Sequence, residues 1–341
     1  MKKFILFFTL MVCSSVQLLS QTANPQQYKY TFTVAKDGSG DYKYIQDAID
    51  AMRVFPLEPI TLYIKNGVYN EKIELPANNT DVTFVGESVE KTIITFNDYS
   101  GRGKLNTFTS PTAKISGNRF VAQNITFSNS AGAVGQALAL YVDADKAVFK
   151  NCRFLGNQDT IYACGENSRQ LFIDCYIEGT TDFIFGPATA VFQNCTIKGK
   201  TNSFITAANT TPGKKYGFVF LDCKVIVDSS VTKILLGRPW RAASKSVFIR
   251  CELPKQIGAE GWNNWNNPAN EKTAFYAEYK NTGEGAVTTG RVAWAKQLTD
   301  KEAKEYTLEN IFANCNAPVA QESVWFQQIR TKTFEWPVTT K

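Results

Sequence analysis

One short sequence pattern recurs five times along this chain, and it constrains the fold more than any other feature. Each copy consists of Val or Leu, then Phe, two further residues, Cys and a β-prone tail, and the five cysteines are Cys152, Cys175, Cys195, Cys223 and Cys251. A sixth copy, over residues 120–127, carries Ile125 at the cysteine position. At this position the repeat therefore requires a medium-sized apolar side chain, and sulfur is not essential.

The spacing of the copies predicts a solenoid. The intervals between equivalent positions are 27, 23, 20, 28 and 28 residues, which is typical of one coil of a parallel β-helix. Strands one coil apart would hydrogen-bond to each other, so equivalent residues would stack about 4.8 Å apart and the cysteines would form a ladder in the core. We therefore predict an all-β fold, a right-handed single-stranded parallel β-helix with helical capping segments.

The caps and the domain boundaries follow from this prediction. Residues 44–52 place four apolar side chains at helical spacing, which indicates an amphipathic helix at the amino end. Residues 299–312 are expected to supply helix near the other end. Because a solenoid grows by adding coils, we expect residues 31–341 to form one domain that includes a C-terminal segment of helix and loop.

The amino terminus has the features of a secretory signal peptide. A basic start precedes an apolar run over residues 4–12, which is shorter than the roughly 20 residues that a membrane span needs. We predict a signal peptide over residues 1–20, a short linker over residues 21–30 and export to the periplasm or beyond. A lipid anchor on Cys13 is the alternative, and the bulky Val12 before it disfavours that alternative.

The redox state of the cysteines stays open at this point. Seven cysteines would remain after removal of the signal peptide, namely Cys152, Cys164, Cys175, Cys195, Cys223, Cys251 and Cys315. Export favours disulfides, and neighbours one coil apart lie within the Cα distance that a disulfide tolerates. Parallel stacking, however, holds the Cβ atoms too far apart, so a ladder of buried free thiols is the alternative.

The chain contains no histidine. This excludes a Ser-His-Asp triad, a Cys-His nucleophile and a zinc site with histidine ligands, so acid–base chemistry must use Asp, Glu, Lys, Tyr or Cys. The formal charge of +6 falls to +4 without Lys2 and Lys3, and no long basic run is present. We expect neither nucleic acid as a partner nor a bound cofactor or metal.

Two aspartates occupy the same position on consecutive coils. Asp159 follows Cys152 by seven residues, and Asp182 follows Cys175 by seven. Two stacked carboxylates repel each other, which splits their proton affinities and leaves one group charged and one protonated. A nucleophile and a general acid need this division. Either aspartate alone is typical of a turn, but the matched offset favours a functional pair.

Several motifs carry a resemblance to a known family. They are Gln136-Ala-Leu-Ala-Leu140, Gly156-Asn-Gln-Asp-Thr-Ile-Tyr162, Gly179-Thr-Thr-Asp-Phe-Ile-Phe-Gly186 and Leu236-Gly-Arg-Pro-Trp240, with weaker matches in residues 37–41 and 67–71. In order and spacing these blocks resemble the signature blocks of the pectin methylesterases, over about residues 33–265. The resemblance implies an exported carbohydrate esterase that hydrolyses methyl esters of galacturonate units in pectin to pectate and methanol.

The resemblance also implies a role for each motif residue. Asp182 would be the nucleophile, and Asp159 would be the acid that protonates methanol and then the base that activates water. Gln136 and Gln158 would stabilise the oxyanion, and Arg238 would hold the nucleophilic carboxylate.

Two aromatic residues would line the sugar groove, namely Trp240 and Phe183. The family resemblance further implies a monomer that acts on methyl-esterified pectin without a cofactor. On position alone, the two glutamines would be amides stacked between successive coils and Arg238 would form a surface ion pair. The two aromatic side chains would lie in the core. Trp262 and Trp265 either extend the sugar platform or pack a loop.

The sequence departs from the family pattern at two positions. Tyr141 stands where many relatives have Arg and Thr181 where Val is common, which leaves the preferred methylation pattern open.

Paired carboxylates about 5 Å apart also suit a retaining glycosidase, whereas a lyase would need a calcium-binding acidic cluster that the sequence lacks. Two further rival functions are non-catalytic binding of a polysaccharide and hydrolysis of an acyl thioester.

Overall fold

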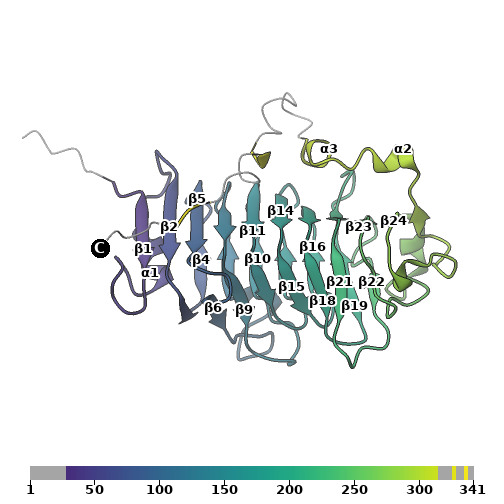
Figure 1. Cartoon of the computed structure of the whole chain (residues 1–341), viewed down its shortest axis with the longest axis horizontal. Helices are drawn as coiled ribbons and strands as arrows, with labels where there is room; N and C mark the ends of the chain where they lie inside the picture. The colour runs from purple at the N-terminus through teal and green to yellow at the C-terminus, as the bar shows by residue number, and fades with distance from the viewer. Residues whose placement is uncertain (1–27, 314–324, 328–333, 337–341) are drawn as a thin grey trace, which may run out of the picture.

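The computed structural model describes residues 28–313, 325–327 and 334–336, and it shows a solenoid of three parallel sheets (Figure 1). Each coil contributes one strand in turn to sheets A, B and C. The proposed signal peptide, most of the linker and Cys315 lie outside the described residues. The predicted all-β parallel β-helix is confirmed.

The three sheets have eleven, seven and seven strands. Sheet A comprises β1 (Thr31–Val34), β2 (Ile60–Ile64), β5 (Val82–Gly86), β8 (Val121–Gln123), β11 (Ala147–Lys150), β14 (Arg169–Ile173), β17 (Thr189–Gln193), β20 (Phe218–Leu221), β23 (Lys245–Ile249), β24 (Phe275–Tyr279) and β25 (Lys296–Gln297). Sheet B comprises β3 (Gly67–Asn70), β6 (Thr92–Phe96), β9 (Thr126–Asn129), β12 (Arg153–Leu155), β15 (Tyr176–Gly179), β18 (Thr196–Gly199) and β21 (Lys224–Val227). Sheet C comprises β4 (Ile73–Leu75), β7 (Ala113–Ile115), β10 (Leu140–Val142), β13 (Ile161–Ala163), β16 (Ile184–Gly186), β19 (Phe204–Ala208) and β22 (Leu235–Gly237).

The sequence repeat forms five neighbouring strands of sheet A and the turns that follow them. Its Phe side chains point inward and stack in register, with ring centroids 4.9, 4.7, 4.6 and 4.2 Å apart between successive coils from Phe149 to Phe248. The residue before each cysteine has a positive φ, between 50° and 55° in the five copies. Asn and Asp tolerate this left-handed conformation, which explains four of the five residues, and Arg250 is the exception.

The cysteine ladder consists of buried free thiols rather than disulfides. The five repeat cysteines and Cys164 are all free. Each repeat thiol donates to a carbonyl one coil away, as Cys175 does to Phe149 O at 3.4 Å and Cys223 to Phe192 O at 3.2 Å. Burial raises the pKa of these thiols, for Cys152 to about 12, and so keeps the reactive thiolate form rare.

Helix α1 packs at the amino end of the solenoid, as predicted, whereas the helices expected at the other end lie along the outer face of sheet A. Helix α1 (Ile45–Asp50) buries Ile45, Ala48 and Ile49, and the Glu71 carboxylate accepts hydrogen bonds from its first two backbone N–H groups. Near the other end lie α2 (Asp300–Ala303) and α3 (Leu308–Phe312), together with the 3₁₀ turns η2 (Pro268–Lys272) and η3 (Glu284–Ala286), whereas η1 (Thr107–Thr109) lies beside sheet C. None of the described helices is long and apolar enough to cross a membrane.

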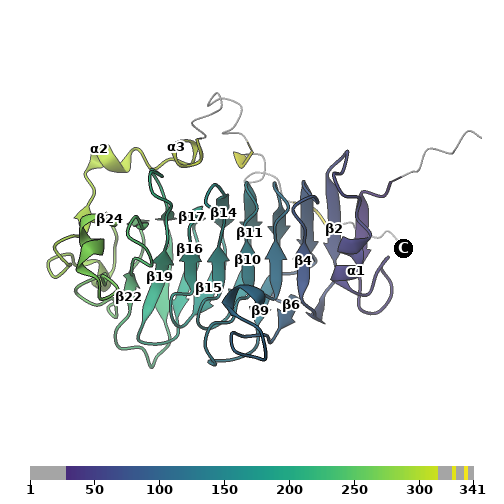
Figure 2. The same cartoon turned by 180° about the vertical axis from the view of Figure 1, so that it is seen from behind.

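The outer face of sheet A carries an aliphatic row that the C-terminal segment covers. The outward residues of the repeat pack against Leu308, Ile311, Phe312 and Phe326, and the row consists of Val148, Leu171, Val191, Val219 and Val247. Figures 1 and 2 show α2 and α3 running along this side of the solenoid. The Phe312 carbonyl accepts from Arg169, whose guanidinium also pairs with Asp145 at 2.7 Å.

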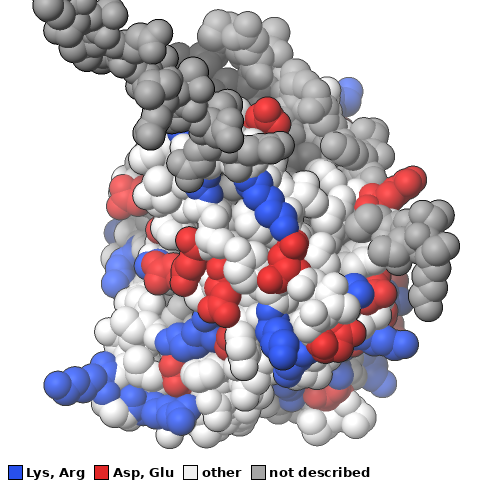
Figure 3. All heavy atoms as spheres, turned by 90° about the vertical axis from the view of Figure 1, so that its left-hand side faces the viewer, with Lys and Arg blue, Asp and Glu red and all other residues white. Residues whose placement is uncertain are grey.

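The amino end of the solenoid has a mixed charge. Figure 3, which looks onto the side drawn at the left of Figure 1, shows acidic and basic side chains interspersed around the exposed apolar and neutral surface. Some are paired, as Arg119 is with Asp81 and Lys29 with Asp41, both at 2.5 Å. This end therefore presents no extended field of one sign.

Candidate active site

The two predicted aspartates lie together at the edge of sheet C. Ile161 on β13 pairs with Ile184 on β16, and each aspartate stands two residues before its isoleucine. Asp159 and Asp182 therefore occupy equivalent positions on adjacent coils. The backbones of adjacent coils lie about 4.8 Å apart. Both have positive φ, 64° and 50°, a conformation that Asp adopts more readily than most residues. The same turn thus presents a carboxylate on two successive coils.

Arg238 fixes the Asp182 carboxylate with a two-pronged contact. Its Nε donates to Oδ1 at 3.0 Å and its second terminal nitrogen donates to Oδ2 at 2.6 Å. The guanidinium is itself held between two rings, 4.1 Å from the centroid of Phe204 and 3.8 Å from that of Trp265. Bidentate contacts of this kind are strong and directional, and cation–π contacts on both sides leave the arginine little freedom.

The environment separates the proton affinities of the two carboxyl groups. Burial, together with the charge of Asp182, raises the pKa of Asp159 from 3.8 to about 8, against a smaller opposing effect of Arg238. Burial also raises the pKa of Asp182, but the hydrogen bonds and charge of Arg238 oppose that rise. Near neutral pH, Asp159 therefore holds a proton while Asp182 carries the negative charge that Arg238 neutralises.

Gln136 and Gln158 lie on adjacent coils beside this pair. Their backbones form a parallel bridge, and the Ala137 N–H donates to the Gln158 carbonyl at 3.2 Å. Both side chains are half-buried, and within the described part of the chain neither carboxamide makes a hydrogen bond. Two amide donors next to the paired carboxyl groups are therefore free to bind an oxygen of a ligand.

An aromatic floor extends from the pair along the outer face of sheet C. Tyr141, Tyr162 and Phe185 occupy the same register position on β10, β13 and β16. The Tyr162 and Phe185 rings stack at 4.6 Å, and Trp240 meets Phe185 edge-on at 5.8 Å. Tyr162 and Phe185 are largely buried, 9% and 4% exposed, whereas Tyr141 and Trp240 are half-buried and supply the more accessible aromatic surface.

Comparison with known proteins identifies the family. The pectinesterase family model matches residues 31–315, and a pectinesterase of Petunia integrifolia is 40% identical over 310 residues, which cover 84% of this chain and 82% of that protein. The chain belongs to the pectinesterase family. It spans about half the length of the first curated relatives it matches, between 40% and 54% of each.

Solved pectinesterase structures share the fold. Pectin methylesterase from carrot superposes with a TM-score of 0.81 at 34% identity, covering 93% of this chain and 99% of that chain. A mutant pectin methylesterase in complex with a hexasaccharide gives a TM-score of 0.71 at 30% identity, covering 85% and 98% of the two chains. The residues that the family motifs single out all lie within the matched region.

The structure departs from the motif-based prediction at Phe183. This side chain is fully buried in the core, so it does not line the groove. Gly179 makes room for it, because a Cβ on that glycine would lie 2.2 Å from the Phe183 Cβ. Phe185 takes the outward place instead. Trp262 is likewise buried, against Phe248 and Tyr276.

Sequence reasoning did not select Tyr162 or Phe185 as outward residues near the aspartate pair. The signal was present, because each is an outward residue in a strand whose neighbours Ile161, Ala163 and Ile184 face the core. Sequence reasoning left Trp265 undecided, and the structure places it on Arg238. Among the described residues, no group of three or more His, Cys, Asp or Glu side chains could hold a metal ion.

Proposed function

We propose that this chain is a pectin methylesterase that converts galacturonate methyl esters in pectin to pectate and methanol. The observation that carries the proposal is the pairing of an arginine-held carboxylate, Asp182, with a buried carboxyl of raised pKa, Asp159. Family membership supplies the substrate class. We also propose export through residues 1–20 and action as a monomer without a cofactor.

In the first half-reaction, the ionised Asp182 attacks the carbonyl carbon of the methyl ester. Negative charge develops on the carbonyl oxygen, where the free carboxamides of Gln136 and Gln158 donate hydrogen bonds. The tetrahedral intermediate collapses as its bond to the methoxy oxygen breaks, and Asp159 gives its proton to the leaving methanol. The products are methanol, an acyl anhydride on Asp182 and an ionised Asp159.

In the second half-reaction, Asp159 acts as the base. It takes a proton from a water molecule, whose oxygen attacks the same carbonyl carbon and breaks the anhydride bond. The galacturonic acid unit leaves and loses the second water proton to solvent as it becomes a carboxylate, Asp182 recovers its charge opposite Arg238, and Asp159 is again protonated. The raised pKa of Asp159 suits both steps, because a group that titrates near neutral pH both donates and accepts a proton readily.

Methanol release from highly methylated pectin tests this function. We expect the purified chain to release methanol, Asp182→Asn to lose about 10⁴-fold or more in kcat, and the control Asp174→Asn to stay within about twofold of the wild type. Asp174 is a matched control because it is an exposed turn residue with the same positive φ.

Two other readouts of the same experiment separate the rival functions. New reducing ends would assign a glycoside hydrolase, and unsaturated products would assign a lyase. The absence of all three products from a chain that binds pectin would contradict catalysis on this polymer.

A further inference from the structure

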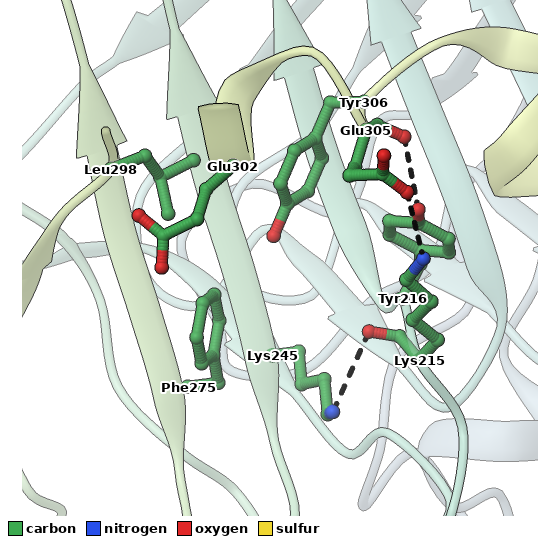
Figure 4. Close-up of a pocket in the computed structure, with 8 residues that line it drawn as sticks. All are labelled: Lys215, Tyr216, Lys245, Phe275, Leu298, Glu302, Glu305 and Tyr306. Atoms are coloured by element: carbon green, nitrogen blue, oxygen red, sulfur yellow. Dashed lines mark hydrogen bonds and ion pairs between the residues drawn. The ribbon is translucent and has the colours of Figure 1, made fainter. Parts of the chain in front are cut away.

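A hollow that does not include the paired aspartates lies between the outer face of sheet A and the segment that carries α2. Figure 4 shows its walls, and its volume is about 280 Å³. Tyr216, Phe275, Leu298 and Tyr306 supply apolar surface, and Lys245 supplies a positive charge. The volume is large enough for one sugar ring with its substituents.

Two loops connect this hollow to the groove. Residues 209–217 join β19 of sheet C to β20 of sheet A, and the wall residue Tyr216 is the penultimate residue of this loop. Residues 238–244 join β22 to β23, and Lys245 follows them directly. The second loop begins with Arg238, which holds Asp182, and it contains Trp240. It ends next to Lys245, which lines the hollow.

The charges around the hollow favour an anion. Within the described part of the chain, Lys245 has no carboxylate partner, and its ammonium donates only to the Lys215 carbonyl at 3.5 Å. It lies 5.9 Å from the centroid of Phe275, and Lys296 lies 4.9 Å from the same centroid. Burial, and then the charge of Lys296, lower the pKa of Lys245. An anion between the two ammonium groups would relieve their repulsion.

The acidic residues of the hollow are already engaged. Glu305 pairs with Lys215 at 3.2 Å, and Glu302 accepts from the Thr299 backbone N–H at 2.8 Å in a helix cap. The Tyr216 hydroxyl donates to the Glu305 carbonyl at 2.9 Å. Among the described residues, Lys245 is therefore the lining cation without a carboxylate partner, and the charge of Glu302 lies near Lys296.

A hydroxyl group and an aromatic ring complete the walls. The Tyr306 hydroxyl points into the hollow in Figure 4 and makes no hydrogen bond to the other residues drawn. The Phe275 ring is half-buried and forms the wall next to Lys245. A cation, a hydroxyl and an open ring face are the groups that bind a carboxylated sugar.

We propose that this hollow is a second carbohydrate site, which binds a galacturonate residue of the de-esterified polymer. The carboxylate would pair with Lys245, the apolar face of the pyranose would lie on Phe275, and a ring hydroxyl would bond to Tyr306. A methyl ester lacks the charge, so the site distinguishes product from substrate. The choice of this sugar rests on the proposed function, and the need for a carboxylate rests on the hollow alone.

Calorimetric titration of the full chain with trigalacturonate tests the site. The Trp240→Ala background weakens the groove, so the remaining binding event reports the hollow. In that background, we expect Lys245→Gln to weaken binding about tenfold or more, because a charge-assisted contact is lost, and Tyr306→Phe to weaken it about threefold. Lys280→Gln is the control, since Lys280 is exposed on the same cap and pairs with Asp300.

The outcomes decide the proposal in either direction. Weaker binding in Lys245→Gln and Tyr306→Phe, with no change in Lys280→Gln, supports the site. No binding in the Trp240→Ala background, equal affinity in Lys245→Gln, or equal binding of neutral galactotriose overturns it. Methanol release, measured on the wild-type chain, reports the proposed function separately, because trigalacturonate binding requires no turnover.

Discussion

The outer faces of sheets A and C are built from the same coils and have opposite surfaces. On sheet A the outward residues of the repeat are aliphatic, and the C-terminal segment buries them against Phe312 and Phe326. On sheet C the outward residues in register are Tyr141, Tyr162 and Phe185, with half-buried Trp240 and Trp265 nearby. In water, a continuous aliphatic row is stable only when other side chains cover it, whereas the polar groups of Tyr and Trp allow these residues to stay partly exposed.

The comparison indicates which residues of this fold determine its stability and which determine its chemistry. The core Phe stack and the thiol ladder are common to all the central coils, so they do not explain why one face is catalytic. The difference arises from the residues that flank each strand, above all the two turns that place Asp159 and Asp182 before β13 and β16. We therefore expect substitutions on sheet C to change rate and those on sheet A to change stability.

The largest expected effect concerns two arginine–aspartate pairs of the same geometry. Arg238→Lys should lower kcat for methanol release about 10³-fold, because lysine keeps the charge but cannot hold both oxygens of Asp182. Arg250 makes the same two contacts to Asp222, at 2.6 and 2.7 Å, but is 50% exposed. Arg250→Lys should leave kcat within about twofold and stability within about 0.5 kcal/mol. Equal losses in both variants would contradict a special role of the buried pair.

On the covered face, Phe312→Ala should reduce the free energy of unfolding by about 3 to 4 kcal/mol, because the side chain is fully buried against the aliphatic row. Denaturant titration measures this change, and kcat at a temperature where the chain stays folded should be unchanged. Leu57→Ala is the control, since Leu57 is 73% exposed. A fall in kcat without a loss of stability would show that the two faces are not independent.

The oxyanion donors should have a somewhat smaller effect. Gln158→Ala should lower kcat about 100-fold, equivalent to about 2.7 kcal/mol of transition-state stabilisation, with little change in KM. Gln297→Ala, an exposed substitution on β25, should have no effect. An increase in KM with an unchanged kcat would instead assign Gln158 to substrate binding.

The last prediction is a pH-dependent gain in the stability of the Asp159→Asn variant relative to the wild type. Because the pKa of Asp159 is raised from 3.8 to about 8, the folded chain binds more protons than the unfolded chain in this window, and stability falls as pH rises through it. Asp159→Asn removes this dependence, so its melting temperature relative to the wild type should rise between about pH 5 and pH 9 while methanol release is lost. A constant difference in melting temperature across this range would contradict the raised pKa.

The sequence predicts most of this architecture because the repeat is local and its spacing equals one coil. The matched offsets after Cys152 and Cys175 also find the aspartate pair. The error at Phe183 has a backbone cause, since the positive φ of Asp182 interrupts the strand alternation and both Phe183 and Ile184 face the core. The cover and the hollow on sheet A depend on contacts between residues far apart in the chain, such as Tyr216 with Tyr306, and no local pattern indicates them.

Infrared difference spectroscopy between about pH 6.5 and pH 9.5 tests the central claim, that Asp159 is protonated near neutral pH while Asp182 is ionised. The account predicts a protonated-carboxyl band in the wild type that disappears with a midpoint near pH 8. The band should be absent in Asp159→Asn and should titrate at lower pH in Asp182→Asn, because the charge of Asp182 is one cause of the raised pKa. A band that persists in Asp159→Asn, or no such band in the wild type, would contradict the account.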